Sequence, residues 1–161
     1  MPKPDFNKVD LELPLGAFSS FDMACIYPAL IKSSKDDVYL EVGVDKGKSL
    51  AFARKYFKGD VFGIDQYDYN DVLGVNFWHM TSNEAVKIWT LPINVLFIDG
   101  DHTYQGVKDD WDNFSPFVVK GGRVFFHDAD SGEVEEFVKT LKNPKWHKKP
   151  GFNTGMASVR L

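Results

Sequence analysis

Four short apolar runs in the middle of the chain are each followed by an acidic residue. Glu41, Asp65 and Asp99 follow the first three runs, and Asp128 follows the fourth after His127. In an open parallel sheet the carboxyl ends of the strands lie along one edge, where ligands bind. Acids gathered there repel one another unless they meet hydroxyls, amines or a cation. The alternative for each single acid is to cap the helix that follows it, but the four together favour a polar ligand site.

The turn after the first run is rich in glycine. It reads E-V-G-V-D-K-G from Glu41 to Gly47. Gly43 and Gly47 would let the backbone approach a ligand closely and aim the N–H groups of a following helix at it. The alternative is a tight strand-to-helix turn that binds nothing. The spacing is not the G-x-G-x-x-G of dinucleotide-binding folds, but a second run ending in Asp65 makes the pattern moderately specific for a ligand site.

Two histidines lie close to these acids in the sequence. His102 is three residues after Asp99, and His127 directly precedes Asp128. A neutral imidazole oriented by a carboxylate is a suitable general base near neutral pH. We expect His102 to be the catalytic base. The alternative for each histidine is a place in a helix cap or in the core.

Composition excludes several classes of protein. The chain has 161 residues, 43% of them hydrophobic, which predicts one domain with a substantial core. The net charge is −4 and no lysine and arginine run stands out, so we expect no nucleic-acid partner. Cys25 is the only cysteine, which excludes an intrachain disulfide and a cysteine-rich zinc site. No apolar run reaches the roughly 18 residues of a membrane span, and no signal peptide is evident, so we expect a cytoplasmic protein without a membrane partner.

The apolar runs are rich in β-branched and aromatic residues, which favours buried strands of a parallel sheet. They cover Val38–Leu40, Val61–Ile64, Ile93–Ile98 and Val124–Phe126. A weaker strand candidate is Asn76–Met80. The tail differs, because Lys145–Lys149 and Met156–Leu161 predict an antiparallel hairpin.

The segments between the runs have the apolar spacing of crossover helices. Helices are predicted over Phe18–Ile31, Ser49–Phe57 and Thr103–Phe117, and from Ser131 onward. Pro28 should kink or end the first helix, and Gly121–Gly122 predict a turn before the fourth strand. The predicted fold class is α/β: a Rossmann-like, doubly wound, mainly parallel sheet of about seven strands, with helices on both faces and a C-terminal antiparallel hairpin. The first and third runs should be neighbours where the strand order reverses, and the third and fourth runs should also be neighbours.

The glycine turn and Asp65 resemble motif I and the acidic ribose loop of class I S-adenosylmethionine-dependent methyltransferases. A longer block looks like the sugar and macrolide O-methyltransferase-like branch, with the pattern IDGDHTY followed by GGxxxxHD. It comprises Phe97–Tyr104, Val107, Asp110, Pro116, Lys120–Gly122 and His127–Asp128. The resemblance implies a single methyltransferase-like domain over 1–161. Its parts would be a helical lead-in (1–34), a cofactor-binding core (38–128) and a terminal helix and hairpin (129–161).

The same resemblance assigns roles to single residues. Those matched to S-adenosylmethionine are Glu41, Gly43 and Gly47 for the methionine moiety, Asp65 for the ribose hydroxyls, Gln66 and Tyr67 for the adenosine, and Ser82 for the adenine loop. Asp99 and Asp128 match the positions where metal-dependent relatives bind Mg²⁺, and His102 matches their general base. The three are therefore the expected catalytic residues.

The resemblance implies methylation of a hydroxyl on a small molecule or sugar. A hydroxyl is a weak nucleophile until its proton leaves, so a cation at Asp99 and Asp128 would lower its pKa and His102 would take the proton. Two other interpretations stay open. One is a nucleotide-cofactor oxidoreductase, which the missing G-x-G-x-x-G disfavours, and the other is a non-catalytic binding protein of the same fold. We expect either an open acceptor site or a pocket completed by a second subunit in a homo-oligomer.

Overall fold

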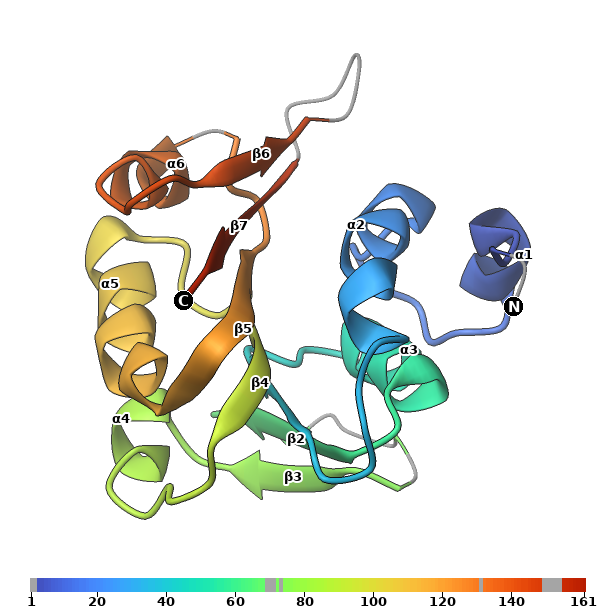
Figure 1. Ribbon diagram of the computed structural model, residues 1–161, viewed down its shortest axis with the longest axis horizontal. Helices are drawn as coiled ribbons and strands as arrows, with labels where there is room; N and C mark the ends of the chain where they lie inside the picture. The colour runs from blue at the N-terminus through green and yellow to red at the C-terminus, as the bar shows by residue number, and fades with distance from the viewer. Residues whose placement is uncertain (1–2, 69–71, 73, 131, 149–154) are drawn as a thin grey trace.

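The structure is a computed structural model that describes residues 3–68, 72, 74–130, 132–148 and 155–161. Within these residues seven strands form one sheet in the order β3-β2-β1-β4-β5-β7-β6 (Figure 1). The strands are β1 (Val38–Val42), β2 (Asp60–Asp65), β3 (Asn76–His79), β4 (Ile93–Ile98), β5 (Val118–Phe126), β6 (Lys145–His147) and β7 (Met156–Arg160). The first five pair in parallel, and β7 pairs antiparallel with β5 and β6. This confirms the predicted fold class, including the C-terminal antiparallel pair.

Helices cover both faces of the sheet (Figure 1). One face carries α1 (Phe6–Leu11), α2 (Ser20–Leu30) and α3 (Lys48–Tyr56), and the other carries α4 (Ser82–Ala85), α5 (Tyr104–Phe114) and α6 (Gly132–Val138). A short 3₁₀ turn, η1 (Ser115–Phe117), follows α5. Each face has its own hydrophobic cluster, with Phe52 and Phe97 buried under the first set of helices and Phe114 and Phe126 under the second.

The strand order reverses at β1 and β4, which lie side by side. The other neighbour of β4 is β5, so both predicted pairings are confirmed. Because β1, β2, β4 and β5 run in the same direction, their carboxyl ends meet at one edge of the sheet. The residues that follow these strands are therefore brought together, as expected for a doubly wound fold.

The predicted turn at Gly121–Gly122 is wrong. These residues lie inside β5, which begins at Val118. Pairing with β4 jumps from Ile93–Val118 to Val95–Arg123, so β5 bulges around the glycines. Gly121 has φ +86°, a left-handed value that glycine adopts without a Cβ penalty. The glycines therefore bend a strand rather than precede it.

Other helix and strand boundaries differ from the predicted ones by a few residues. Strand β1 extends to Val42, so Glu41 lies within the strand and not after it. Helix α2 passes through Pro28 and ends two residues later at Leu30, and α1 was not predicted. Helix α5 ends at Phe114, where η1 begins. The predicted helix start at Ser131 lies outside the described residues.

Candidate active site

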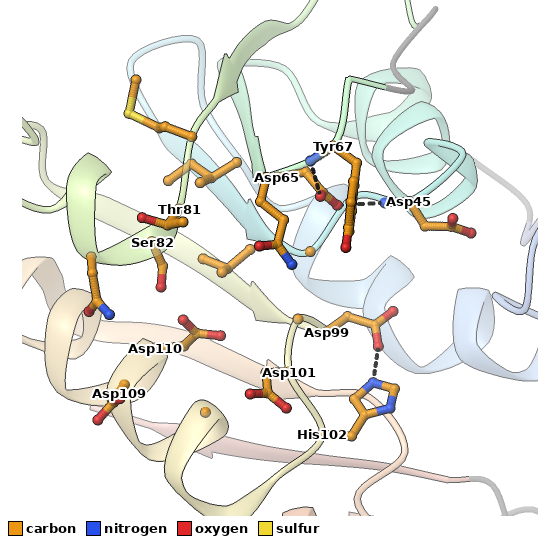
Figure 2. Close-up of a pocket in the computed structure, with 18 residues that line it drawn as sticks. Asp45, Asp65, Tyr67, Thr81, Ser82, Asp99, Asp101, His102, Asp109 and Asp110 are labelled. Atoms are coloured by element: carbon orange, nitrogen blue, oxygen red, sulfur yellow. Dashed lines mark hydrogen bonds and ion pairs between the residues drawn. The ribbon is translucent and has the colours of Figure 1, made fainter.

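A pocket of about 600 Å³ opens at the carboxyl edge of the sheet, bordered by the ends of β1, β2 and β4 and by α4 and α5 (Figure 2). The predicted site residues that line it are Gly43, Asp65, Gln66, Tyr67, Ser82, Asp99 and His102. Glu41, Gly47 and Asp128 are not among the lining residues. The edge predicted from the strand-end acids therefore does carry a pocket, but not every predicted residue reaches it.

Gly43 is held against the chain itself. It has φ +84°, and a Cβ built on it would lie 2.3 Å from the backbone oxygen of Asp99. Only glycine lets the loop after β1 pack this closely on the end of β4. Gly47 also has a positive φ, +80°, and serves as the N-cap of α3. Both glycines are required by the turn, whether or not a ligand is bound.

Asp65 fastens the glycine loop to the end of β2. Its Oδ2 accepts hydrogen bonds from the backbone N–H of Val44 (2.7 Å) and of Asp45 (2.9 Å), and its Oδ1 accepts one from Tyr67 (2.9 Å). Asp65 therefore does cap backbone N–H groups, which was the alternative to ligand binding for a strand-end acid. Oδ2 already accepts two hydrogen bonds and Oδ1 accepts one, so one lone pair on Oδ1 remains for a ligand hydroxyl from the pocket.

Glu41 does not belong to the pocket. It is fully buried in β1, and its carboxylate accepts hydrogen bonds from the Tyr39 hydroxyl (2.7 Å) and the Ser49 hydroxyl (2.6 Å). Burial raises the pKa of Glu41 to about 8, although both hydrogen bonds oppose the shift. Glu41 was predicted to follow the first strand, but it lies inside β1 and does not line the pocket. Its contact with the cofactor stays a prediction.

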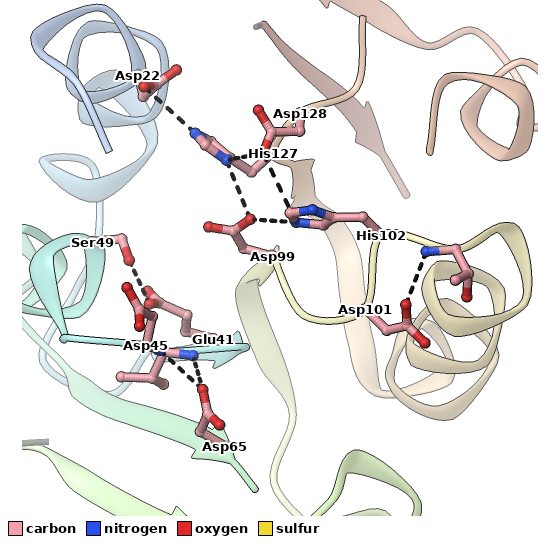
Figure 3. Close-up of polar contacts among 12 residues, drawn as sticks. Asp22, Glu41, Asp45, Ser49, Asp65, Asp99, Asp101, His102, His127 and Asp128 are labelled. Carbon is pink, nitrogen blue, oxygen red and sulfur yellow. Dashed lines mark hydrogen bonds and ion pairs between the residues drawn. The ribbon is translucent and has the colours of Figure 1, made fainter. Parts of the chain in front are cut away.

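Asp99, His102 and Asp128 converge beside the pocket, as predicted (Figure 3). The Nε2 atom of His102 lies 3.2 Å from Asp99 Oδ1 and 3.9 Å from Asp128 Oδ2. The His102 side chain is 53% exposed, so an acceptor can reach it. The contact with Asp99 raises the pKa of His102 against the opposing effect of burial. A more basic imidazole in open contact with the pocket suits a group that takes up a proton.

His127 is buried between three carboxylates. Its Nδ1 lies 3.2 Å from Asp99 Oδ1 and 3.2 Å from Asp128 Oδ2, off the line of a hydrogen bond, and its Nε2 lies 3.5 Å from Asp22 Oδ2 (Figure 3). Burial alone would lower the pKa of His127, but its contacts with Asp128, Asp22 and Asp99 outweigh burial and raise the pKa to about 12. His127 is therefore an imidazolium, and its charge offsets the repulsion between Asp99 and Asp128.

Two buried acidic residues of this region were missed from the sequence. Asp22 comes from α2, and its only sequence signal is a capping box with Ser19, whose backbone N–H and hydroxyl both donate to it. Asp110, on α5, is buried at the wall of the pocket opposite Ser82 (Figure 2). Burial raises the pKa of Asp110 to about 6, against a hydrogen bond with Ser82. Asp110 stood in the block that carried the resemblance, but nothing there indicated that it lines a pocket.

Residues 40–129 match a family model described as a methyltransferase domain, which is more than half of the chain. The chain belongs to the methyltransferase domain family. An uncharacterised protein of Acanthamoeba polyphaga mimivirus, R132, is 34% identical over 116 residues, which are 58% of this chain and 52% of that protein. This chain thus spans about half the length of that relative.

Solved methyltransferase structures share the fold. The MycE methyltransferase of the mycinamycin biosynthetic pathway, in complex with Mg, S-adenosylhomocysteine and mycinamycin VI, matches with TM-score 0.73 and 18% identity over 98% of this chain and 54% of MycE. A putative rRNA methylase of Clostridium thermocellum matches with TM-score 0.68 and 15% identity over 86% of this chain and 94% of that one. At these identities the likeness shows the fold alone. No described helix of this methyltransferase is long and apolar enough to cross a membrane.

Proposed function

We propose that this methyltransferase uses S-adenosylmethionine to methylate a hydroxyl group of a small molecule or sugar. The observation that carries the proposal is the convergence of Asp99, His102 and Asp128 beside the pocket. An acid pair with an exposed imidazole is the arrangement needed to remove a proton from a hydroxyl. The alternative of a nucleotide-cofactor oxidoreductase has no such use for the cluster.

The pocket fits the proposed cofactor by size and charge. Its volume of about 600 Å³ suits a nucleoside-sized ligand. Six aspartates line it: Asp45, Asp65, Asp99, Asp101, Asp109 and Asp110. Such a lining favours a ligand that carries a sulfonium and an ammonium group. When bound, S-adenosylmethionine supplies the methyl group on that sulfonium. In this arrangement the free lone pair on Asp65 Oδ1 would accept from a ribose hydroxyl, and Gln66 and Ser82 would border the nucleoside.

A divalent cation also fits the cluster. Ligand atoms of Asp99, His102 and Asp128 lie within 4.8 Å of one another, and two carboxylates are a hard donor pair of the kind that Mg²⁺ takes. An ion held by Asp99 and Asp128 would act as a Lewis acid toward the acceptor hydroxyl. His102 would then take up the hydroxyl proton, and His127 lies against the same two carboxylates. The ligand role of His102 and its role as base are alternatives for the same Nε2 atom.

The acidic lining also bears on the acceptor. RNA methylases are among the structural neighbours, but a phosphate backbone would be repelled by six aspartates around the reacting centre. We therefore place a small-molecule or sugar hydroxyl ahead of RNA. We further propose that 38–128 form the cofactor-binding core of the domain and that a second subunit completes the acceptor side. Sedimentation with and without acceptor tests the last point.

The first test is calorimetry with S-adenosylhomocysteine. The wild-type protein should bind it, and Asp65→Asn should weaken binding by about 1–3 kcal/mol because the ribose loses a charged acceptor. Asp68→Asn is the matched control, since Asp68 is exposed and does not line the pocket. Absence of binding by the wild type, or binding of NAD in its place, would overturn the proposal.

The second test separates catalysis from binding. His102→Gln should leave the affinity for S-adenosylhomocysteine unchanged and lower turnover by roughly 10²- to 10⁴-fold, as expected for loss of a general base. Acceptor panels of sugar or macrolide hydroxyls and of total RNA, each with and without a metal chelator, identify the substrate class. Cofactor binding without turnover on any acceptor would favour the non-catalytic alternative.

A further inference from the structure

A second cavity, of about 280 Å³, lies at the opposite edge of the sheet. It is formed by the residues that precede or begin β1 and β4, by the first half of β5 and by the last residue of β7, with the end of α2 beside them. Because β1 and β4 run from this edge toward the active site, the two cavities are separated by the length of the strands. The methyl-transfer chemistry proposed above makes no use of this second cavity.

Four cationic side chains line the cavity: Lys32, Lys120, Arg123 and Arg160. Among the described residues none of the four forms an ion pair with a carboxylate, although ion pairs are found elsewhere in the chain. The one acidic residue in the lining is Asp37, and its carboxylate is turned to Ser34, accepting from the Ser34 backbone N–H (3.0 Å) and hydroxyl (2.9 Å). The chain as a whole has a net charge of −4, so this concentration of positive charge is local.

Two of the cations are placed opposite each other by the sheet itself. Arg123 on β5 and Arg160 on β7 are direct partners in the antiparallel register. Side chains at such positions point to the same face, and like charges there are destabilising. Arg160 is further held by a hydrogen bond from its Nε to the backbone oxygen of Gly121 (3.3 Å). The fold thus places the two arginines on one face of the sheet at this cavity, and neither forms an ion pair with a carboxylate of the described residues.

We propose that this cavity binds the phosphate or sulfate group of a small ligand. Guanidinium groups present paired N–H donors that match an oxyanion, and the two lysines add point charges around it. An anion between Arg123 and Arg160 replaces their repulsion with two attractive contacts. The cavity admits an oxyanion with a short organic part, and free phosphate and a phosphate ester share the chemistry that would be recognised.

The experiment follows backbone amide signals of the full chain by two-dimensional NMR during titration. The probes are inorganic phosphate, pyrophosphate and ribose 5-phosphate at constant ionic strength. The amide signals of Gly121 and Gly122, which line the cavity, should shift with a dissociation constant in the millimolar range or below. Tighter binding of the ester than of the free ion would identify an organic phosphate as the ligand. The reverse order would identify the free ion.

Charge variants make the test specific. Arg160→Gln should weaken binding about fivefold or more, and Lys120→Gln by a smaller factor. Asp37→Asn should tighten it, because the single negative charge in the lining is removed. Lys142→Gln is the matched control, since Lys142 is exposed and does not line the cavity.

Three outcomes would overturn the proposal. The first is that Gly121 and Gly122 do not shift with any of the three probes. The second is that Arg160→Gln and Lys142→Gln have equal effects on the dissociation constant. The third is that only an RNA oligonucleotide shifts these signals, which would show a nucleic-acid surface instead of a small-ligand site.

Discussion

The pocket at the carboxyl edge of the sheet is lined by six aspartates, whereas the cavity at the opposite edge is lined by four cations. The acids are held in place by the fold. Asp65 accepts three backbone hydrogen bonds, and Asp99 is flanked by the imidazoles of His102 and His127. Within the part of the chain that the structure describes, the cations have one such restraint among them, the bond from Arg160 to Gly121. The acidic pocket is thus arranged before a ligand arrives, while the basic cavity depends on its ligand for order.

The difference follows from the lengths of the side chains and from what borders them. Aspartate is short, so its position is set by the backbone of the strand end, loop or helix that carries it. Lysine and arginine are long, and ordering them costs conformational entropy that only a ligand can offset. We therefore expect substitutions at the acidic edge to change the stability of the free protein. Substitutions at the basic edge should act mainly on ligand affinity.

The largest expected effect concerns Glu41, which we exclude from the acidic pocket. Its pKa of about 8 lies above the ordinary 4.5, so the folded state keeps a proton that the unfolded chain releases, and stability falls as pH rises from 4.5 to 8. The full loss is at most about 5 kcal/mol. Glu41→Gln should remove this part of the pH dependence, as measured by urea unfolding at pH 5 and pH 8. The free energy of unfolding of Glu136→Gln, an exposed control, should change between pH 5 and pH 8 as much as that of the wild type.

That result would sharpen the comparison, because it separates a buried, protonated acid from the acids that line the pocket. If Glu41→Gln and the wild type lose equal stability between pH 5 and pH 8, Glu41 is ionised in the folded state. It would then have to be counted with the pocket acids.

Gly43→Ala should destabilise the protein by about 2–5 kcal/mol, from the sum of left-handed strain and overlap with rigid backbone. The added Cβ would lie 2.3 Å from Asp99 O and 2.5 Å from the Cα of Gly100. Gly132→Ala is the matched control, since Gly132 also has a positive φ, +64°, but nothing lies within 4 Å of its Cβ position. The control should lose about 1 kcal/mol. Equal losses in thermal unfolding would mean that the loop yields without strain.

Asp22→Asn should cost about 1–3 kcal/mol, because buried His127 loses one of its three carboxylate contacts. Ser19→Ala is the control. It removes the hydroxyl partner of Asp22 at the helix cap and leaves the contact with His127 in place. The imidazole NMR signals of His127 should move in Asp22→Asn and stay in Ser19→Ala. Unmoved signals in both variants would show that Asp22 acts only as a helix cap.

The smallest effect belongs to the basic edge. Gly121 has φ +86°, close to the value of Gly43, but its nearest foreign atom is the flexible end of Arg160, 3.4 Å from the Cβ position. Gly121→Ala should therefore cost about 1 kcal/mol, the strain alone. It should also weaken phosphate binding by displacing the guanidinium. A loss as large as that of Gly43→Ala would contradict the view that this edge is loosely ordered.

Much of the fold was predictable, because buried parallel strands appear in the sequence as apolar runs. Glycines and acidic residues at the ends of these runs mark where each strand stops. The convergence of Asp99, His102 and Asp128 followed from the rule that strand ends meet at one edge, supported by the family resemblance. The role of Glu41 was not predictable, because an error of two residues in a strand end decides whether a side chain is buried or open. The bulge at Gly121–Gly122 was mistaken for a turn because glycine is common in both β-bulges and turns.

Two features leave no local signal at all. Asp22 looks like an ordinary capping residue, and its second partner, His127, is more than a hundred positions away. The basic cavity draws its cations from α2, β5 and β7, so no cluster of lysine and arginine is visible in the sequence. The Asp22–His127 contact and the basic cavity both depend on which elements the sheet brings together. No short segment of the sequence indicates that.

The contact between Asp22 and His127 also has a consequence for the order of events during synthesis. Helix α2 leaves the ribosome before its partner strand β5 has been made. Until β5 is present, Asp22 stays hydrated and adds no desolvation penalty to folding. Asp22 loses its hydration only when α2 docks on β5. At that moment the His127 imidazolium is present to offset the cost of that desolvation. Burying α2 before β5 is in place would desolvate Asp22 without that offset, although Met23, Ile26 and Leu30 of the same helix favour burial. The contact therefore links the docking of α2 to the completion of β5.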